Sequence, residues 1–264
     1  MPRGPVYNSI GFRYSAHRQP DPRIVAELFE LIDVPSGSTL ADVGAGSGNY
    51  SRALADRGFR LIAVEPSSVM QKQADRHPSV VWCTAVAENI PLRDLSVGGV
   101  VCILALHHFK SAADSLREMI RISSGPIVVL TFDPRAEQRF WLREYFPHVW
   151  ADAYRAFSPL QDILVLLRAG GAAAVECFPF RLPPNLQDRF LAAGWQQPEM
   201  YFDPDIRACM SGFALADQTV VSAGLQRLRT ELDNGSWEVK HGWVRRLQAF
   251  DAGYRFILAR PRAT

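Results

Sequence analysis

A short glycine-rich segment, residues 41–49, contains the residues best suited to hold a ligand. It reads ADVGAGSGN and lies between an apolar run and a stretch with helical periodicity. Glycine at Gly44, Gly46 and Gly48 lets the backbone turn tightly and lets a ligand approach closely, because any Cβ atom would stand in the way. Glu65 ends the next apolar run, where its carboxylate can accept hydrogen bonds from both hydroxyls of a ribose. The pattern indicates a site for a nucleoside-containing cofactor.

Two cofactor classes fit such a turn followed by an acid, the nicotinamide dinucleotides and S-adenosylmethionine (SAM). The glycines here alternate, whereas the dinucleotide fingerprint spaces them Gly-x-Gly-x-x-Gly. Asp42 lies two positions before the first glycine, where its charge would repel a pyrophosphate but suits a ligand that carries an ammonium and a sulfonium. The sequence has no Gly-x-x-x-x-Gly-Lys-Ser/Thr segment, which excludes a P-loop nucleotide triphosphatase. These features favour SAM.

Apolar runs that alternate with helical patterns place this segment in a parallel α/β sheet built from crossover units. The expected strands are residues 39–43, 60–64, 80–84, 99–104, 126–132, 172–180 and 253–260, and the expected helices are residues 49–57, 67–76 and 111–122. A further helix is expected with Ser158 as its N-cap, Pro159 in its first turn and Gly170 as its stop. If the strand at 253–260 returns to the main sheet, the helical stretch before it is an insertion within one domain.

At these residues the chain resembles the class I SAM-dependent methyltransferases, in the small-molecule branch that includes the ubiquinone-biosynthesis and malonyl-carrier-protein methyltransferases. Residues 7–132 carry the resemblance well, and the last two strands carry it in pattern only. Segment 87–92 looks like the part that packs on adenine, and segment 104–109 like the part beside the methyl group. The resemblance implies a Rossmann-like, doubly wound α/β fold: a mostly parallel sheet, an antiparallel last strand and helical insertions that cover the site.

The cofactor residues implied by this resemblance come from the loop, from the strand ends and from an aromatic lead-in before the sheet. They are Asp42, Gly44, Ala45, Gly46, Gly48, Glu65, Pro66, Ala87, Glu88, Leu104, Tyr14 and Arg18. Tyr14 and Arg18 would close the site, and Arg18 would pair with the carboxylate of SAM; the alternative is a tail packed on the core.

One departure from the family pattern concerns adenine. Many relatives carry an acidic residue two positions before Glu88 to bond the adenine amine, and this chain has Val86 there. Adenine would then be held by the backbone amide of Ala87, by Glu88 and by apolar contact, with Trp82 and Cys83 lining that wall.

Methyl transfer from SAM is an in-line displacement, and it needs a proton acceptor only if the nucleophile must lose a proton. His107 and His108 follow the fourth strand, at the sheet edge where ligands bind in such folds. His107 is the candidate catalytic residue, as a base or as a hydrogen-bond partner of the substrate; helix capping or packing is the alternative. A base would make activity rise with pH through the ordinary imidazole pKa of about 6.5.

Aromatic residues at helical spacing occupy residues 140–154, after the fifth strand. Because an insert at this place lies over the active site, we expect a lid with an apolar pocket and with Trp141 and Tyr145 on the substrate side; a stripe of this kind is also typical of a core. The stretch 181–247 completes the cover or forms a dimer surface, so the chain is expected to be a monomer or a homodimer.

Charge and cysteine content narrow the partners and the compartment. The formal net charge is +2, with no basic run, so neither nucleic acid nor an anionic membrane is an expected partner. The fourth strand ends in Leu104-Ala105-Leu106-His107, without the Asn/Asp-Pro-Pro-aromatic clamp for a flipped base. No apolar run approaches the roughly 20 residues of a membrane-spanning helix. Four dispersed cysteines favour reduced thiols, a cytoplasmic location and no metal site.

We therefore expect a single SAM-methyltransferase domain that methylates a small-molecule acceptor and releases S-adenosylhomocysteine. A SAM-binding enzyme of the same fold with non-methyl chemistry and a non-catalytic SAM-binding protein are the alternatives. The expected segments are a helical lead-in at 1–37, a cofactor-binding core at 38–133, a lid insert at 134–157, a helix and strand at 158–180, a helical insertion at 181–249 and a final strand at 250–264.

Overall fold

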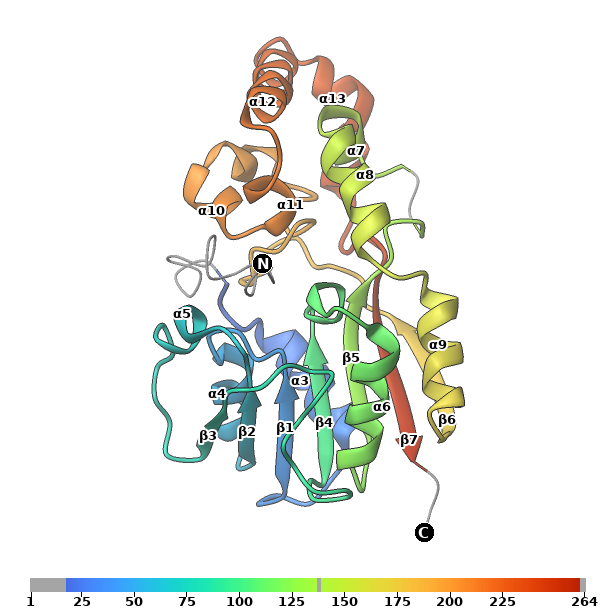
Figure 1. Cartoon of the computed structure of the whole chain (residues 1–264). Coiled ribbons are helices and arrows are strands. Elements are labelled where there is room, and N and C mark those ends of the chain that lie inside the picture. Colours follow the sequence, from blue (N-terminus) through green and yellow to red (C-terminus); the bar gives the residue numbers. More distant parts are fainter. Residues whose placement is uncertain (1–17, 137–138, 262–264) are drawn as a thin grey trace.

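The computed structural model describes residues 18–136 and 139–261, which are built around a seven-stranded sheet (Figure 1). The strands are β1 Thr39–Val43, β2 Arg60–Val64, β3 Val80–Cys83, β4 Gly99–Ile103, β5 Ile127–Phe132, β6 Ala172–Pro179 and β7 Tyr254–Pro261. Their order is β3-β2-β1-β4-β5-β7-β6. Strands β1 to β5 pair in parallel, whereas β7 is antiparallel to both β5 and β6. The predicted Rossmann-like sheet with an antiparallel last strand is confirmed.

Helices cover both faces of this sheet. Successive side chains of each strand point to opposite sides, so apolar strand residues on both faces need a layer of helix to bury them. The helices α3 Pro22–Ile32 and α4 Asn49–Ala55 share an apolar cluster with Leu40 of β1. The helices α6 Ala112–Ile122 and α9 Leu160–Ala169 share a second cluster with the next residue, Ala41. The sheet is therefore buried between two layers of helix, as a parallel sheet requires.

The structure corrects the sequence prediction for α5 Ser68–Gln71 and for α9. The helix expected at 67–76 is only α5, and the Gln71 side-chain amide donates to the Glu65 carbonyl oxygen at 2.6 Å. Tertiary contacts to the ends of the neighbouring strands, not a longer helix, hold this segment. Helix α9 begins at Leu160 after an extended Pro159, so Ser158 is not its N-cap.

A separate group of helices, which we call the cap (residues 139–157 and 181–249), lies over the carboxyl ends of the parallel strands (Figure 1). It contains α7 Leu142–Tyr145, α8 Pro147–Ala156, α10 Pro204–Ala208, α11 Ser211–Ala214, α12 Gln218–Asp233 and α13 Ser236–His241, with 3-10 turns at Pro198–Phe202 and Gly242–Arg246. The cap thus joins two stretches of chain on either side of α9 and β6.

Aromatic packing holds the two stretches of the cap together. Trp141 lies edge-to-face with Trp237 and with Tyr201, with 5.6 Å between ring centroids in each pair. Its indole Nε1 donates to the carbonyl oxygen of Trp195 at 2.7 Å. All four side chains are buried, and truncating such a residue to alanine costs about 3–5 kcal/mol.

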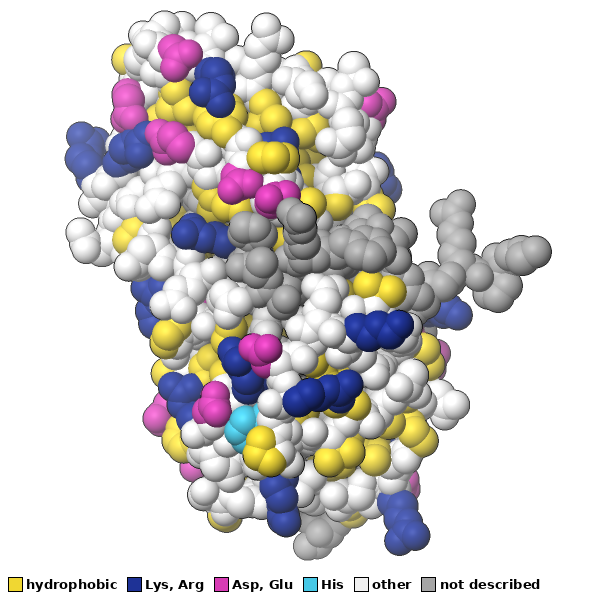
Figure 2. Space-filling model, turned by 90° about the vertical axis from the view of Figure 1, so that its left-hand side faces the viewer, with side chains coloured by type: hydrophobic (Ala, Val, Ile, Leu, Met, Phe, Trp, Pro, Cys, Tyr) yellow, Lys and Arg dark blue, Asp and Glu magenta, His cyan; other side chains and the backbone are white. Residues whose placement is uncertain are grey.

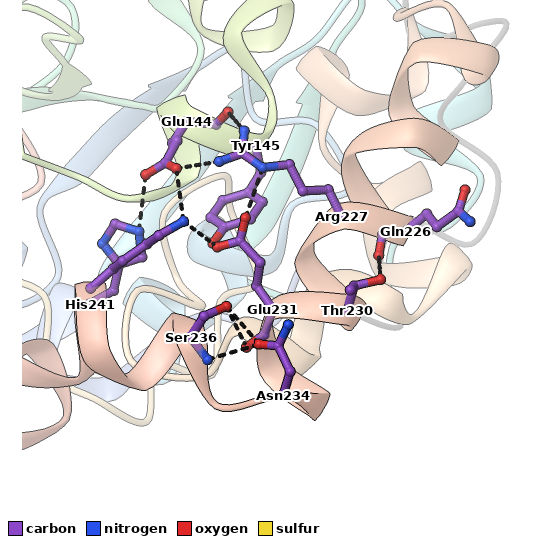
Figure 3. A network of polar contacts seen from close by, with 10 residues as sticks. Glu144, Tyr145, Gln226, Arg227, Thr230, Glu231, Asn234, Ser236 and His241 are labelled. Carbon is purple, nitrogen blue, oxygen red and sulfur yellow. Dashed lines mark hydrogen bonds and ion pairs between the residues drawn. The ribbon is translucent and has the colours of Figure 1, made fainter.

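A polar network reinforces the same junction on the outside of the cap (Figure 3). The Tyr145 hydroxyl donates to Glu231 Oε2 of α12 at 2.7 Å. Glu144 of α7 faces His241 Nε2 of α13 at 3.1 Å and also pairs with Arg227. Helices α7, α12 and α13 are tied together here, so the first stretch of the cap depends on the second.

Deleting residues 249–264 should abolish cooperative unfolding. The deletion removes β7, which lies between β5 and β6, and it removes the buried side chains Phe256 and Leu258. Circular dichroism during heating is the measurement, and a chain that ends at Pro261, the last residue of β7, is the control. A deletion variant that melts near the temperature of the full chain would contradict this account.

Candidate functional site

The glycine-rich loop between β1 and α4 has the backbone conformation expected for it. Gly44, Gly46 and Gly48 have φ angles of 79°, 59° and 73°, a region that side chains other than glycine rarely adopt. A Cβ atom on Gly44 would lie 2.5 Å from Cβ of Ala105, and one on Gly48 would lie 2.8 Å from the Trp82 ring. At these two positions glycine is required because the side chains of Ala105 and Trp82, not a ligand, lie against the loop backbone. The loop therefore packs tightly on these neighbours.

Glu65, directly after β2, is fixed by the same loop. Its carboxylate accepts hydrogen bonds from the backbone amides of Gly46, at 3.0 Å, and Ser67, at 2.8 Å. The residue is 8% exposed, and its burial raises the pKa of the carboxyl despite the two amides. An acidic group is therefore held in a set orientation beside the glycine loop.

Asp42 lies beneath the loop, which differs from the contact with ligand that the sequence suggested. Its carboxylate is 2% exposed and accepts a hydrogen bond from Ser51 Oγ of α4 at 2.5 Å. Burial raises its pKa to about 6, with Ser51 opposing and Glu65 adding to the shift. Asp42 is absent from the wall of the cavity that opens beside the loop. Its side chain braces the loop against α4.

A first cavity of about 340 Å³ opens at this edge of the sheet. Its wall includes most of the predicted cofactor residues: Arg18, Gly44, Ala45, Gly46, Glu65, Pro66, Ala87, Glu88 and Leu104. Gly48 lies behind the loop and is absent from this wall, and Tyr14 lies outside the described residues. The structure thus brings together residues from the ends of β1, β2 and β4 and from the segment after β3.

The segment after β3 forms one end of the first cavity. Val86 is 43% exposed and Ala87 is buried, and both line the wall. Glu88 Oε1 accepts hydrogen bonds from the backbone amides of Lys110 and Ser111, at 2.6 and 3.2 Å. Glu88 therefore fixes the chain that leads into α6, a role that the sequence analysis did not foresee.

A second cavity of about 500 Å³ lies under the cap. Its wall is mostly apolar and aromatic: Phe132, Val149, Ala153, Ala156, Phe157, Phe190, Leu191, Met210, Gly212, Leu215 and Tyr254, with Asp152, Ser211 and His107. Arg18, Leu104 and His108 line both cavities and mark the place where they meet. Leu104 has a φ angle of 51°, and strained backbone of this kind concentrates at ligand sites.

Trp141 and Tyr145 do not line this second cavity, in contrast to the prediction. Both side chains are buried inside the cap, Trp141 against other aromatic rings and Tyr145 on Glu231. The aromatic stripe of residues 140–154 is a core, whereas Val149 and Ala153 of α8 face the cavity. The insert lines the second cavity through Val149, Asp152, Ala153, Ala156 and Phe157.

The two histidines lie where β4 ends. The His107 ring stacks on Phe157 with 3.9 Å between centroids and contacts the His108 ring at 3.8 Å. Burial, followed by the charge of Arg18, lowers the pKa of His108 to about 4. Burial, followed by the charges of His108 and Arg18, lowers the pKa of His107 well below its usual value. Both imidazoles are neutral at pH 7. A pH dependence centred near 6.5 is therefore not expected.

Asp188 and Tyr50 are polar residues of the first cavity that were not predicted from the sequence. Asp188 lies in an irregular segment of the cap, 138 residues from Tyr50, whose hydroxyl donates to it at 2.9 Å. Nothing in the local pattern around Asp188 indicates such a contact. Tyr50 could have been found, because it follows the glycine loop directly in the first turn of α4.

Other features of the described part of the chain bear on its surroundings. None of its helices is long and apolar enough to span a bilayer. Residues 18–136 and 139–261 contain no group of three His, Cys, Asp or Glu side chains that could hold a metal ion. On the face shown in Figure 2, Lys and Arg side chains are interspersed with Asp and Glu.

Comparison with known proteins assigns this site to a family. The methyltransferase domain model matches residues 41–126. A crystal structure from Anabaena variabilis ATCC 29413, described as a putative methyltransferase from an antibiotic biosynthesis pathway, is 50% identical, with a TM-score of 0.90 over 93% of this chain and 99% of that one. The chain belongs to the class I SAM-dependent methyltransferases. SAM is the cofactor of this methyltransferase.

More distant relatives match the methyltransferase over part of its length. An uncharacterized methyltransferase of Mycobacterium tuberculosis is 28% identical over 160 residues, which are 60% of this chain and 64% of the relative. The match therefore spans about 64% of that relative's length. A ubiquinone/menaquinone biosynthesis C-methyltransferase of Rubrivivax gelatinosus is 29% identical over 115 residues, 42% of this chain and 45% of the relative.

Substituting Glu65 by glutamine should weaken binding of S-adenosylhomocysteine by about ten- to a hundredfold, the loss of about 1.5–3 kcal/mol for hydrogen bonds to a charged group. Because the pKa of Glu65 is raised, affinity should begin to fall at a higher pH on acidification than for an ordinary glutamate. Calorimetry measures both effects. Glu176→Gln, which removes a surface carboxylate paired with Arg260, is the control. Unchanged affinity in Glu65→Gln would remove this residue from the cofactor site.

Proposed function

We propose that the methyltransferase transfers the methyl group of SAM to a small apolar molecule bound in the second cavity. The observation that carries this proposal is the shared wall formed by Arg18, Leu104 and His108. One cavity has the glycine loop and a fixed carboxylate, and the other has apolar and aromatic walls. Two ligands that occupy them would meet at this shared wall, as a transfer reaction requires.

We propose that the first cavity holds SAM, because its wall offers a partner for each part of the molecule. Glu65 would accept hydrogen bonds from the ribose hydroxyls. Ala87 and Phe109 would pack on adenine, and Arg18 would face the carboxylate at the other end. When bound, SAM supplies a methyl group on a positively charged sulfur, which makes the methyl carbon reactive toward a nucleophile.

The second cavity suits an acceptor without a strong charge. Its acidic residue, Asp152, pairs with Arg155, and its arginine, Arg18, pairs with Asp188. Its two histidines are neutral at pH 7. The names of the Rubrivivax and Anabaena relatives refer to quinone and antibiotic biosynthesis, which is consistent with a small-molecule acceptor. A cytoplasmic location and a monomeric or homodimeric state stay predictions.

The contribution of the protein to the reaction is mainly alignment. Holding the acceptor atom in line with the methyl carbon is worth several kcal/mol, and a shift of about 1 Å can cost a hundredfold in rate. The apolar wall from α8 and α11 would exclude water from the acceptor. His108, which lines both cavities, is better placed than His107 to hydrogen-bond the acceptor or to take its proton.

Filling the second cavity should impair the acceptor and spare the cofactor. Ala153 of α8 is 7% exposed and lines this cavity, so Ala153→Leu should lower turnover at least tenfold. The assay offers SAM with a panel of apolar alcohols, phenols, amines and thiols and follows S-adenosylhomocysteine and the methylated product by mass spectrometry. Affinity for S-adenosylhomocysteine should stay within twofold.

The matched control is Ala151→Leu, two residues away on the outer face of α8, which should behave as the wild type. If an acceptor is found and Ala153→Leu methylates it at the normal rate, the second cavity is not the acceptor site.

His108→Ala should reduce turnover at least tenfold, or roughly 1.4 kcal/mol of transition-state stabilisation, with affinity for S-adenosylhomocysteine within a fewfold. Burial disfavours the charged imidazolium, so the neutral form that can accept a proton persists down to a pKa of about 4. Activity of the wild type should therefore be constant from pH 6 to 8 and decline only at more acidic pH. Steady-state rates across this range, with circular dichroism to follow the fold, are the measurement.

His77→Ala, a change remote from both cavities, serves as the control for the loss of an imidazole. An activity that rises through pH 6.5 in the wild type and in His108→Ala alike would exclude His108 as the group that titrates.

A further inference from the structure

A buried ion pair lies in the wall of the first cavity, at the end nearest the second. Arg18 Nε and Nη2 donate to the two carboxylate oxygens of Asp188, the latter at 3.4 Å. The Tyr50 hydroxyl donates to Asp188 Oδ2 at 2.9 Å. Asp188 is 1% exposed and the Arg18 side chain 11%. All three residues line the first cavity.

The three members come from separate parts of the chain. Arg18 precedes α3, Tyr50 lies in α4 directly after the glycine loop, and Asp188 belongs to the cap. The backbone of Arg18 is held as well, because its carbonyl oxygen accepts a hydrogen bond from Asn49 Nδ2 at 2.6 Å. Asp188 is thus the point at which the lead-in, the cofactor loop and the cap meet.

Stability alone gives a weak reason for this arrangement. Desolvating two charges costs several kcal/mol, and apolar residues of similar size often hold a fold together as well as a buried ion pair does. An arginine kept in one orientation, in contrast, is useful for recognising a carboxylate, because its planar group binds two oxygens at once. Ligand recognition by Arg18 therefore explains the buried Arg18–Asp188 pair better than a contribution to the stability of the fold does.

The position of Arg18 indicates which part of the cofactor it would meet. Glu65 lies directly after β2 and Ala87 in the segment after β3, whereas Arg18 lies where the first cavity reaches the second. If the nucleoside of SAM binds at Glu65 and Ala87, the amino-acid part of SAM extends toward Arg18. The other cationic side chain of this wall belongs to Lys110, whose backbone amide donates to Glu88 of the segment after β3.

We propose that Asp188 is a positioning residue for the cofactor: it fixes the guanidinium of Arg18 against the carboxylate of SAM, and Tyr50 holds Asp188 in place. A guanidinium has five N–H donors, more than one carboxylate takes, so one arginine can bind two carboxylates at the same time. Fixing Arg18 beforehand reduces the ordering cost of binding. The proposal rests on the cofactor and is independent of the acceptor.

The test compares two ligands by calorimetry: S-adenosylhomocysteine and S-adenosyl-3-thiopropylamine, which lacks only the carboxylate. The wild type should prefer the first at least tenfold. Asp188→Asn should reduce that preference at least fivefold, with affinity for the decarboxylated ligand within twofold of the wild type. Tyr50→Phe, which keeps the ring and removes one hydrogen bond, should reduce the preference two- to threefold.

Arg23→Gln provides a matched control. Arg23 also links the start of α3 to the cap, through Asn185 Oδ1 at 2.8 Å, but it lines neither cavity. This variant should keep the preference of the wild type. Equal losses for both ligands in Asp188→Asn and Tyr50→Phe would show that Asp188 supports only the fold or the ammonium group, and would overturn the proposal. An unchanged preference in both variants would overturn it too.

Discussion

Five strands that run in one direction all end at the same edge of the sheet, and this constraint decides where the site lies. Gly44 follows β1, Glu65 follows β2 and Leu104 follows β4, each directly after the last residue of its strand. Backbone pairing in the sheet therefore sets the distances between these residues before any side chain contributes. The loop glycines add the local turn, and the amides of Gly46 and Ser67 hold the acid.

The cap is attached to this edge by packing that continues from the sheet. A single apolar cluster includes Leu40 of β1, Phe132 of β5 and Trp141 and Trp237 of the cap. Strand β7 contributes to it through Phe256 and Leu258, because it runs back from the cap into the sheet. The cover of the site is therefore part of the hydrophobic core, and the second cavity is a gap left where that core meets the strand ends.

The sequence predicted the elements whose signal is local. The strands, the glycine loop and Glu65 were found because periodicity and spacing reveal them within a few dozen residues. Asp42 and Trp141 were predicted to face a ligand, and the structure buries both side chains instead. The type of a residue does not reveal which way its side chain faces. Asp188 was missed for another reason: its partners, Arg18 and Tyr50, are 170 and 138 residues away, and only the folded cap brings them together.

The walls of the two cavities come from different stretches of chain, with few residues in common. Helices α8 and α11 supply small side chains such as Ala153 and Gly212 to the second cavity and none to the first. Amino-acid substitutions at these cap positions change the volume and shape of the second cavity, while the glycine loop and Glu65 stay unchanged. If the second cavity holds the acceptor, as proposed above, the architecture is evolvable: a few substitutions in the cap can adapt it to a new acceptor while the cofactor stays the same.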